Sequence, residues 1–582
     1  MERRVLLAIF LSFLVIYAWQ ALFFKPASKP APGSATTSTT ATTAPPDAAP
    51  LEATTSPTPA PTPAPTPVRA AASVVGESSE HDVKVETKDL IAVFTNRGAL
   101  LRSLRLKRYA DARREPLELI AQNLPPGQPL PFSLRVADTG VTSALNTALY
   151  AVSGAPSSPA SPETVPVQLR FEYQDTSGLH SVKQFHLESS SFVVTFRANV
   201  NVADRVLTPA IQWGPGLGDT EMVSRFSVRP GGLLSVGGKE QRLLPAAIVK
   251  QPTYDAEFKF AGVEDHYFLT VALDPGSSKV TFEPLTIPAP EASGGTPRTL
   301  MAYSLEPAQA DRPIKFYIGP KDFDQLAIVD RDLVRAINFG LFTVIVVPLL
   351  RSLKWINGYV GNYGFSILAL TAMINLIILP LRHKSVVSMR KMQEIQPEAK
   401  AIQDRYAKLK TTDPAKQKMN QELMALYKER GVNPASGCVP MLIPFPILIA
   451  FYSLLTTAIE LRGAPFMLWI HDLSLPDPYY VTPILMGVSQ LWQQWIAPAA
   501  GVDPIQRRMM MIMPVVFTFL FISYPAGVAL YWLASNAWAI GQQYATNYLI
   551  GPPKIRAPLS AGERRMKRVG ASKTEDAAAR EN

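Results

Sequence analysis

The stretch LTAMINLIILPLRHKS, residues 370–385, joins an apolar run to a basic segment. Its first twelve residues are almost wholly apolar, yet Asn375 stands in their middle, and Pro380 comes shortly before the basic triplet RHK. A long apolar run that ends in basic residues is typical of a transmembrane helix reaching water. The sequence therefore predicts a membrane-spanning helix near 364–382 with an amide at its centre.

Other apolar runs have a similar length. The N-terminal run, Val5 to Phe24, follows two arginines and ends in aromatic residues. A cleaved signal peptide is the alternative, but its apolar region is usually shorter and a small-residue cleavage site follows it. We expect a retained anchor with its N-terminus in the cytoplasm. Four more spans are predicted near 438–459, 481–498, 509–525 and 527–549.

The run AINFGLFTVIVVPLL, residues 336–350, is either a further span or a helix lying on the membrane surface. Residues 382–433 contain 12 Lys and Arg and residues 551–582 contain 8, whereas 460–480 contains one. Cytoplasmic loops carry the excess of Lys and Arg, and this holds only if 336–350 does not span. We therefore predict six transmembrane helices, with both termini cytoplasmic.

The residues between the anchor and the other spans have a different character. Residues 26–67 contain 12 prolines among Ala, Thr and Ser, which predicts an extended tether. From about 80 to 320, segments such as VQLRFEY (167–173) and VTFRANVNV (194–202) alternate strictly between apolar and polar residues. This alternation predicts half-buried antiparallel strands, so we expect an all-β sandwich outside the membrane.

Residues 384–431 have helical spacing of apolar residues on both sides of KTTDPAK (410–416), which predicts a cytoplasmic helical hairpin. The fold class is thus an α-helical membrane protein with an extramembrane all-β sandwich domain. The predicted parts are the anchor (1–24), the tether (25–79), the periplasmic β-sandwich (80–320), a periplasmic amphipathic surface helix (321–360), a five-helix core that includes the hairpin (361–550) and a basic cytoplasmic tail (551–582).

Several function classes lack a sequence signal. The net charge of +10 is explained by topology and lipid, not by nucleic acid. The six histidines form no metal-ligand cluster, there is no phosphate-binding loop, and Cys438 is a lone thiol in an apolar stretch. We predict neither a metal, a cofactor nor an enzyme activity.

The predicted spans carry uncharged polar residues that cost free energy when they face lipid. Either these side chains hydrogen-bond between helices, or they line a hydrated groove. Methionines suit surfaces that accept varied apolar partners, although interfacial packing explains them equally well. Groove candidates are Ser366, Thr371, Asn375, Gln490, Gln494, Tyr531, Trp532 and Asn536, and the client-contacting candidates on the hairpin are Met389, Met392 and Met419.

Four stretches carry a resemblance to a known family. They are GNYGFSILALT (361–371), NPASGCVPMLIPFPILIAFY (433–452), APFMLWIHDLSLPDPYYVTPILMG (464–487) and FTFLFISYPAGVALYWLASNAWAIGQQ (517–543). These resemble the YidC membrane-protein insertases of Gram-negative inner membranes in detail over 355–550, and the whole layout resembles them more loosely. The resemblance implies ATP-independent insertion of nascent membrane proteins through a hydrophilic groove, alone or beside the Sec translocon SecYEG.

One residue departs from the family pattern. The resemblance implies an arginine in the groove five residues before the Pro-Leu pair, and this chain has Asn375 there, while Thr371 one turn earlier matches. We therefore expect a polar groove whose attraction for acidic client tails is weakened at this position.

Two other functions compete with insertion. A transporter or lipid flippase would use the same polar groove, and a membrane-tethered sugar-binding or structural protein would use the β-sandwich. Client insertion into proteoliposomes distinguishes an insertase from a transporter or flippase. Deletion of residues 80–320 distinguishes an insertase from a protein that works through its β-sandwich.

Overall fold

The computed structural model describes residues 72–550, apart from residues 112, 123 and 126 and the ranges 156–165, 218–228, 288–297, 407–414, 432–443 and 497–503. The predicted anchor, most of the tether, the basic tail, Cys438 and the tip of the hairpin lie outside the described residues. Ala401–Ala425 belongs to a compact unit separate from the rest of the described chain.

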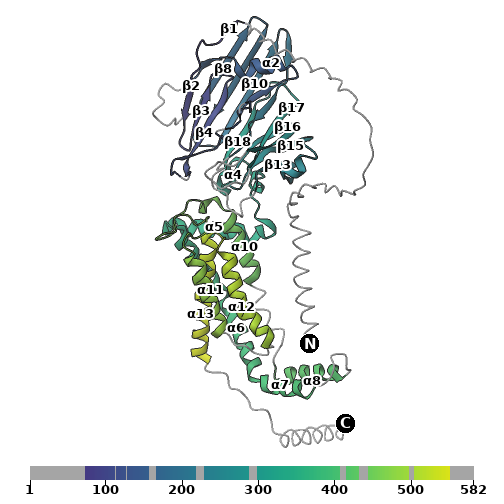
Figure 1. The fold of residues 1–582 in the computed structure, drawn as a ribbon, viewed down its shortest axis with the longest axis vertical. Coiled ribbons are helices and arrows are strands. Elements are labelled where there is room, and N and C mark those ends of the chain that lie inside the picture. The colour runs from purple at the N-terminus through teal and green to yellow at the C-terminus, as the bar shows by residue number, and fades with distance from the viewer. Residues whose placement is uncertain are drawn as a thin grey trace, which may run out of the picture. The chain divides into compact units, whose positions relative to one another are not determined.

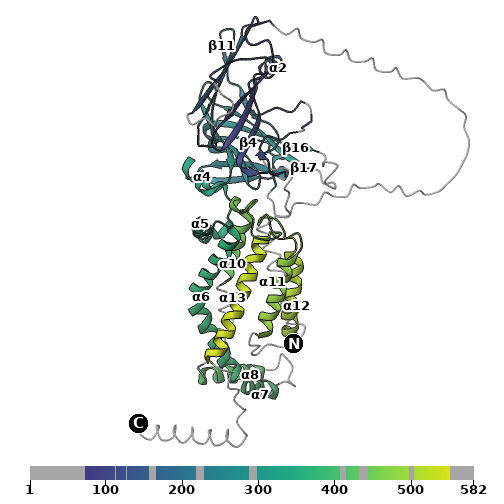
Figure 2. The ribbon, with the colours of Figure 1, turned by 90° about the vertical axis from the view of Figure 1, so that its left-hand side faces the viewer.

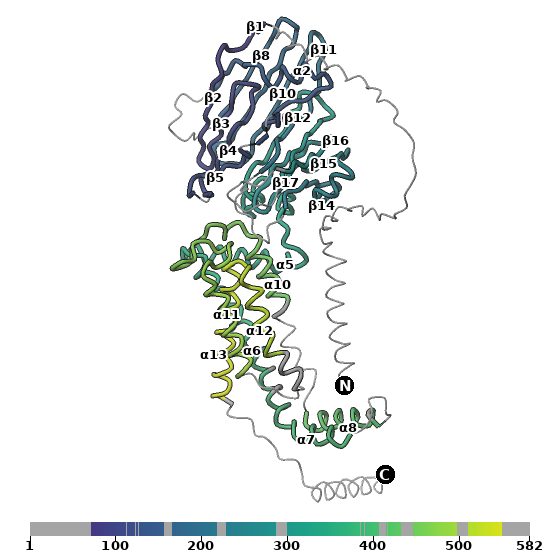
Figure 3. The backbone as a smooth tube through the Cα atoms, viewed as in Figure 1, coloured from purple at the N-terminus to yellow at the C-terminus, as the bar shows by residue number. Residues whose placement is uncertain are grey.

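Two antiparallel sheets form the β domain (Figures 1 and 3). Its strands are β1 Ser73–Val75, β2 Asp82–Glu86, β3 Leu90–Thr95, β4 Leu100–Ala110, β5 Pro116–Glu118, β6 Ser133–Arg135, β7 Ala151–Ser153, β8 Val167–Asp175, β9 Leu179–Leu187, β10 Val193–Val202, β11 Arg205–Leu207, β12 Ala210–Trp213, β13 Gly231–Val236, β14 Lys239–Leu243, β15 Thr253–Glu264, β16 Phe268–Ile287, β17 Arg298–Pro307 and β18 Ile314–Pro320. The larger sheet follows β1-β8-β9-β10-β18-β16-β15-β13-β14, and the smaller follows β2-β3-β4-β5.

Aromatic side chains fill the space between the two sheets. Phe94 on β3 lies 4.7 Å from Phe185 on β9, centroid to centroid, and both are fully buried. The strict alternation of VQLRFEY is reproduced in β8, where Val167, Leu169 and Phe171 face the core. One buried face per strand explains the alternation, because successive side chains point to opposite sides. The predicted β-sandwich is therefore confirmed.

A buried lysine also links the two sheets. The ammonium of Lys183 on β9 donates to the carbonyl oxygens of Gly98, at 2.6 Å, and Phe132, at 3.0 Å. Gly98 lies in the turn between β3 and β4 of the other sheet and has a φ of 70°, a conformation that favours glycine. Lys183 has no carboxylate partner among the described residues, so burial lowers its pKa to about 7.

The helices follow the larger part of the β domain, except for two short ones within it. They are α2 Thr139–Thr147, α3 Pro245–Ile248, α4 Phe323–Val329, α5 Thr343–Val360, α6 Tyr363–Glu394, α7 Gln396–Arg405, α8 Ala415–Glu429, α10 Pro444–Thr457, α11 Val481–Ile496, α12 Pro504–Phe521 and α13 Ala526–Ile550, with short 3-10 turns at η2 Leu333–Ala336, η3 Gly340–Phe342 and η5 Ile459–Leu461. Helix α13 packs against both α6 and α11 (Figure 2).

Gly361 and Asn362 form the junction between α5 and α6. Gly361 ends α5 with a φ of 69°, a left-handed conformation typical of a helix C-terminus. The side-chain oxygen of Asn362 then accepts the backbone N–H of Phe365 at 3.2 Å and caps α6. The amide of Asn362 also donates to the carbonyl of Phe466, which ties this junction to the loop before α11.

Helix α6 is longer than predicted. The helix extends beyond the span predicted near 364–382, because α6 runs through Pro380 to Glu394. Proline removes one backbone donor, but the flanking turns keep theirs, so a long helix can continue past it. The hairpin predicted at 384–431 therefore has α7 and α8 as its arms, while its first residues belong to α6.

The hairpin arms are held together by charged pairs. Arg405 on α7 and Glu422 on α8 lie 2.9 Å apart, and Tyr406 donates to the same carboxylate at 2.9 Å. Near the other end, Arg430 pairs with Glu398 at 2.8 Å. Contacts at both ends show that α7 and α8 run antiparallel, as a hairpin requires.

Two described helical segments, Gly340–Val360 and Tyr363–Glu394, are long and apolar enough to cross a membrane, and 446–457 and 510–521 are shorter apolar helices. Length and composition thus do not separate α5 from a span. Its contacts are partly polar: Lys354 lies 3.6 Å from Asp322 and 3.0 Å from Glu460. These ion pairs join α5 to the end of the β domain and to the loop before α11. They do not test whether α5 lies on the membrane surface, so its surface position stays a prediction.

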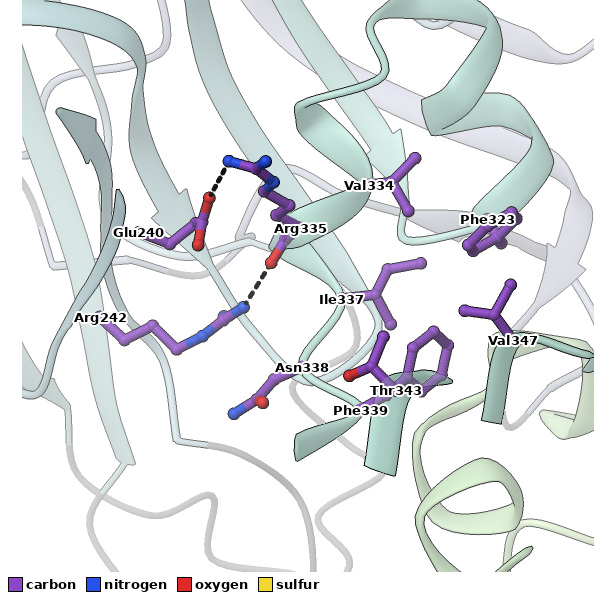
Figure 4. A pocket seen from close by; sticks show the side chains of 10 residues that line it. All are labelled: Glu240, Arg242, Phe323, Val334, Arg335, Ile337, Asn338, Phe339, Thr343 and Val347. Carbon is purple, nitrogen blue, oxygen red and sulfur yellow. Dashed lines mark hydrogen bonds and ion pairs between the residues drawn. The ribbon is translucent and has the colours of Figure 1, made fainter. Parts of the chain in front are cut away.

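A cavity of about 580 Å³ lies between β14, η2 and the start of α5 (Figure 4). On its polar side, the Arg335 guanidinium lies 3.5 Å from Glu240, and Arg242 donates to the Arg335 carbonyl at 3.1 Å. Phe339 and Val347 line the apolar side. Its charged groups already have partners, so the cavity is a packing feature of the junction.

We predict that the free energy of unfolding of the β domain rises between pH 7 and pH 9.5 by roughly 2–3 kcal/mol. Between pH 7 and pH 9.5, Lys183 is protonated in the unfolded chain but mostly neutral in the folded domain. Folding therefore releases a proton, and this release costs less free energy as the pH rises. Denaturant titrations of a fragment covering residues 72–330 measure it. Lys183→Met should abolish the rise and Lys250→Met, at an exposed site, should keep it; an equal rise in both contradicts the assignment.

Candidate functional site

The three polar candidates on α6 are all buried, but they do not share one environment. Ser366 lies near the helix start, where its hydroxyl donates to the carbonyl of Asn362 at 2.8 Å. Thr371 donates to the carbonyl of Ile367 at 2.6 Å, and the Asn375 amide donates to the carbonyl of Thr371 at 2.8 Å. Each bond returns to the preceding turn of the same helix. In the described structure Thr371 and Asn375 therefore do not hydrogen-bond to another helix.

Asn536 behaves differently, because it does join two helices. Its amide on α13 donates to the carbonyl of Met486 at 3.2 Å and to the hydroxyl of Ser489 at 3.0 Å, both on α11. Asn536 is 5% exposed. This candidate is thus an interhelical hydrogen-bonding residue, which is the alternative role that the sequence left open.

Buried polar atoms without a hydrogen-bond partner gather on α11 and α13. On α11 they are the side-chain carbonyl oxygens of Gln490 and Gln494, one helical turn apart. On α13 they belong to Ser535, Trp538 and Gln542, and both polar atoms of Gln542 are unpartnered. A buried polar group without a partner costs about 1–3 kcal/mol, so such a cluster is suited to binding water or a polar ligand.

The two aromatic candidates on α13 face different helices. Tyr531 is 8% exposed and stacks on Phe451 of α10, with a centroid distance of 4.2 Å and an interplanar angle of 9°. Trp532 contacts Phe521 of α12 edge-on at 5.0 Å and Phe517 at 5.6 Å. Trp532 therefore packs α13 against α12, and only Tyr531 lies toward the α10 side.

The hairpin methionines give a limited picture. Met392 near the end of α6 and Met419 on α8 are both partly buried, and the side chain of Met389 lies outside what the structure describes. A client-contacting role for these methionines stays a prediction.

The sequence marks Ser535 and Gln542 as polar residues of the last span, but they were not among the groove candidates, and Trp538 was not considered. Ser535, Trp538 and Gln542 are spaced by three and four residues, so they form one face of a helix. The same spacing relates Tyr531 to Ser535. A count of polar groups per helical face would have found this stripe, whereas reading polarity residue by residue favoured Asn536.

An antiparallel β-sandwich joined to a bundle of long apolar helices, with polar groups enclosed among those helices, defines a membrane protein with a large extramembrane domain. Residues 82–352 match the family model described as the YidC periplasmic domain, and residues 355–552 match the 60Kd inner membrane protein family.

The curated relatives agree with these models. A membrane protein insertase YidC from Geobacter metallireducens is 34% identical over 577 residues, which cover 96% of this chain and 100% of the relative. One from Geobacter sulfurreducens is 42% identical over 300 residues, or 51% of this chain and 54% of that one. A solved structure of an active YidC insertase with its first transmembrane domain resolved covers 82% of this chain and 95% of its own, at 18% identity and a TM-score of 0.33.

The chain belongs to the YidC family of membrane protein insertases. This membership confirms the resemblance seen in the sequence and decides against the transporter or flippase alternative. It places the chain among inner membrane proteins with a periplasmic domain and among insertases rather than enzymes. Its clients are nascent membrane proteins.

We predict different effects on stability for two sets of polar residues, the glutamines on α11 and Asn536 on α13. Replacing Gln490 and Gln494 together by Leu removes unpartnered oxygens, so thermal stability in detergent should be unchanged or higher, while insertion of a client with a polar flank falls. Asn536→Leu loses two interhelical bonds and should lower stability by roughly 1–2 kcal/mol. A destabilised double Gln variant would show that the glutamines are structural.

Proposed function

We propose that this insertase admits the polar flank of its client into a hydrated groove lined by α6, α11 and α13, while the client's apolar segment passes into lipid along α6 and α10. The observation that carries the proposal is the cluster of unpartnered buried polar atoms on α11 and α13. Thr371 and Asn375 add polar groups from α6, whose hydrogen bonds stay within their own helix. A client or water can therefore use this lining without breaking bonds between helices.

The energetics of insertion fit such a lining. A polar segment meets the full cost of desolvation in a bilayer, since hydrocarbon offers no hydrogen bonds. A groove that provides water and amide groups partway across lowers this cost. Burial of about 20 apolar residues of the client in lipid then supplies the driving force. The chain has no phosphate-binding loop, which supports insertion without ATP.

Helix α6 offers an apolar side suited to the client's transmembrane segment. Ile377 is 70% exposed and Leu376 is 58% exposed, whereas Asn375 beside them is 4% exposed. Buried polar and exposed apolar residues on one helix are the inverse of a helix in water, and they suit a helix between lipid and a polar interior. We assign the exposed side to the passage of the client.

The proposal includes six transmembrane helices with both termini in the cytoplasm. The ion pairs of Lys354 support one part of it, because they place the loop before α11 at the same end of α6 as the β domain. The other end of α6 leads into residues 382–433, which contain 12 Lys and Arg. A periplasmic β domain and a basic segment that follows the far end of α6 along the chain agree with the positive-inside rule.

The hairpin and a Sec translocon complete the proposed partners. The hairpin, whose arms are joined by ion pairs, is the part that meets a client before the client enters the groove. Work beside SecYEG rests on the family resemblance alone. Crosslinking between the β domain and SecYEG subunits in native membranes tests it directly.

We predict that Asn375→Leu lowers insertion of a single-span client with a polar, uncharged tail, while Asn375→Arg preserves it. Leucine has the same branched shape and number of side-chain heavy atoms but lacks the amide, so the groove loses a hydrogen-bonding group midway along α6. Insertion into proteoliposomes that hold the purified full chain measures the effect. Thr371→Val, which removes a hydroxyl on the same face, should act in the same direction.

The matched control is a client whose tail is short and apolar, because this client does not need the groove. Both variants should insert it normally. Normal insertion of the polar-tailed client by Asn375→Leu would reduce Asn375 to a residue that bonds only within its own helix.

A further inference from the structure

The loop between η5 and α11 contains a tight turn whose tip is apolar. The backbone N–H of Phe466 donates to the carbonyl of Ile470 at 2.9 Å, and the N–H of Ile470 donates to the carbonyl of Met467 at 3.1 Å. Met467 and Leu468 at the tip are 46% and 70% exposed. Turn tips favour Gly, Asn, Asp and Ser, so two adjacent exposed apolar side chains are unusual at this place.

The backbone of Leu468 makes this choice of residue more unusual. Its φ is 55°, a left-handed conformation that is strained for leucine but not for glycine. Tyr480, directly before α11, repeats the combination with a φ of 59° and 49% exposure. Neither the backbone conformation nor solubility in water favours leucine at position 468. The apolar side chain itself is therefore the property that this position requires.

The charged groups of the loop do not lie at this tip. Residues 463–480 contain no Lys or Arg, and residues 466–470 contain no titratable side chain. The Asp472 carboxylate accepts the backbone N–H of Ser474 at 2.8 Å, and the Asp477 carboxylate accepts that of Thr482 at 2.8 Å. Both acids thus stabilise the loop and the start of α11, and the tip offers an uncharged apolar surface.

The turn is fixed to the start of α6. The Asn362 amide donates to the carbonyl of Phe466 at 2.9 Å. A Cβ atom at Gly364 would overlap the ring of Phe466, so glycine at this position allows the ring to pack closely on the helix. The same ring contacts Phe365 edge-on at 5.1 Å between centroids.

The turn is fixed to the start of α11 as well. The indole N–H of Trp469 donates to Asp477 at 3.0 Å, and this carboxylate also accepts the hydroxyl of Thr482 at 2.9 Å. Asp477 is only 2% exposed. The tip therefore holds a defined position relative to both helices.

Aromatic side chains continue the apolar surface from the tip to the two helices. Phe365 in the first turn of α6 is 46% exposed, and Tyr479 before α11 is 67% exposed. Aromatic residues at the ends of membrane-spanning helices are typical of the interface between lipid and water, where one part of the ring is apolar and the other is wet. Because the tip adjoins these rings at the starts of two proposed spans, a lipid surface is the partner that fits it.

We propose that Met467 and Leu468 insert into the boundary between lipid headgroups and acyl chains and thereby fix the depth at which α6 and α11 begin. The proposal rests on the proposed spans α6 and α11, but not on the proposed groove. Interfacial apolar side chains reach about 5–10 Å into this boundary. The turn would hold both helices at one level in the bilayer while a client passes.

The experiment measures how deeply Leu468 lies in lipid. Cys438 is the only cysteine of the chain, so a Cys438→Ser background with one new cysteine carries a single fluorophore. Leu468→Cys, Ile377→Cys on α6 and Val249→Cys on the β domain start from similar exposures of 70%, 70% and 73%. Each full chain is placed alone in a lipid nanodisc without a client, and is quenched by nitroxide-labelled lipid or by aqueous iodide.

The label at Leu468→Cys should lose fluorescence at least about twofold with a nitroxide on the upper acyl chain, which lies at the depth of an interfacial residue, and should resist iodide. Val249→Cys should show the reverse. Quenching of Leu468→Cys by iodide alone, with Ile377→Cys still quenched by lipid, would overturn the proposal and leave the span intact. Absence of lipid quenching at both Leu468→Cys and Ile377→Cys would contradict the span as well.

A second variant separates a lipid anchor from a structural residue. Leu468→Asn keeps a residue that tolerates the left-handed conformation but removes the apolar side chain. Thermal unfolding in detergent should be unchanged, while lipid quenching of a label at Met467→Cys should be lost. A lower unfolding temperature, or unchanged lipid quenching, would show that Leu468 does not anchor the turn in lipid.

Discussion

Buried polar atoms in an apolar bundle need hydrogen-bond partners, and in this chain the protein does not supply all of them. Gln490 and Gln494 on α11 and Gln542 on α13 each keep a side-chain oxygen without a protein partner. The bundle therefore contains polar atoms that can still form hydrogen bonds. A polar segment that crosses a membrane needs such groups.

The features that the sequence could predict are those in which each residue's role is local. The alternation of β8 follows from one buried face, and the break between α12 and α13 follows from Tyr524-Pro525-Ala526. The capped junction at Gly361-Asn362 has the same local origin. The full length of α6 was not predictable in this way, because the end of an apolar run marks the end of lipid contact and not the end of the helix.

The role of each polar residue depends on what lies opposite it, and no single sequence contains this. From the sequence, Asn536 and Gln490 are both polar residues within predicted spans. In the structure Asn536 donates a hydrogen bond to Ser489, whereas the side-chain oxygen of Gln490 has no partner among the described residues. Trp532 and Tyr531 are adjacent in the sequence, yet Trp532 packs against α12 and Tyr531 packs against α10.

The central claim, that polar and apolar parts of a client take different sides of α6, is tested most directly by site-specific crosslinking to a stalled nascent chain. A photoreactive residue at Asn375 should crosslink to the client's polar flank, and one at Ile377, on the exposed side, should crosslink to its apolar segment. Crosslinks from both positions to the same apolar segment, with none from Asn375 to the polar flank, would contradict the claim.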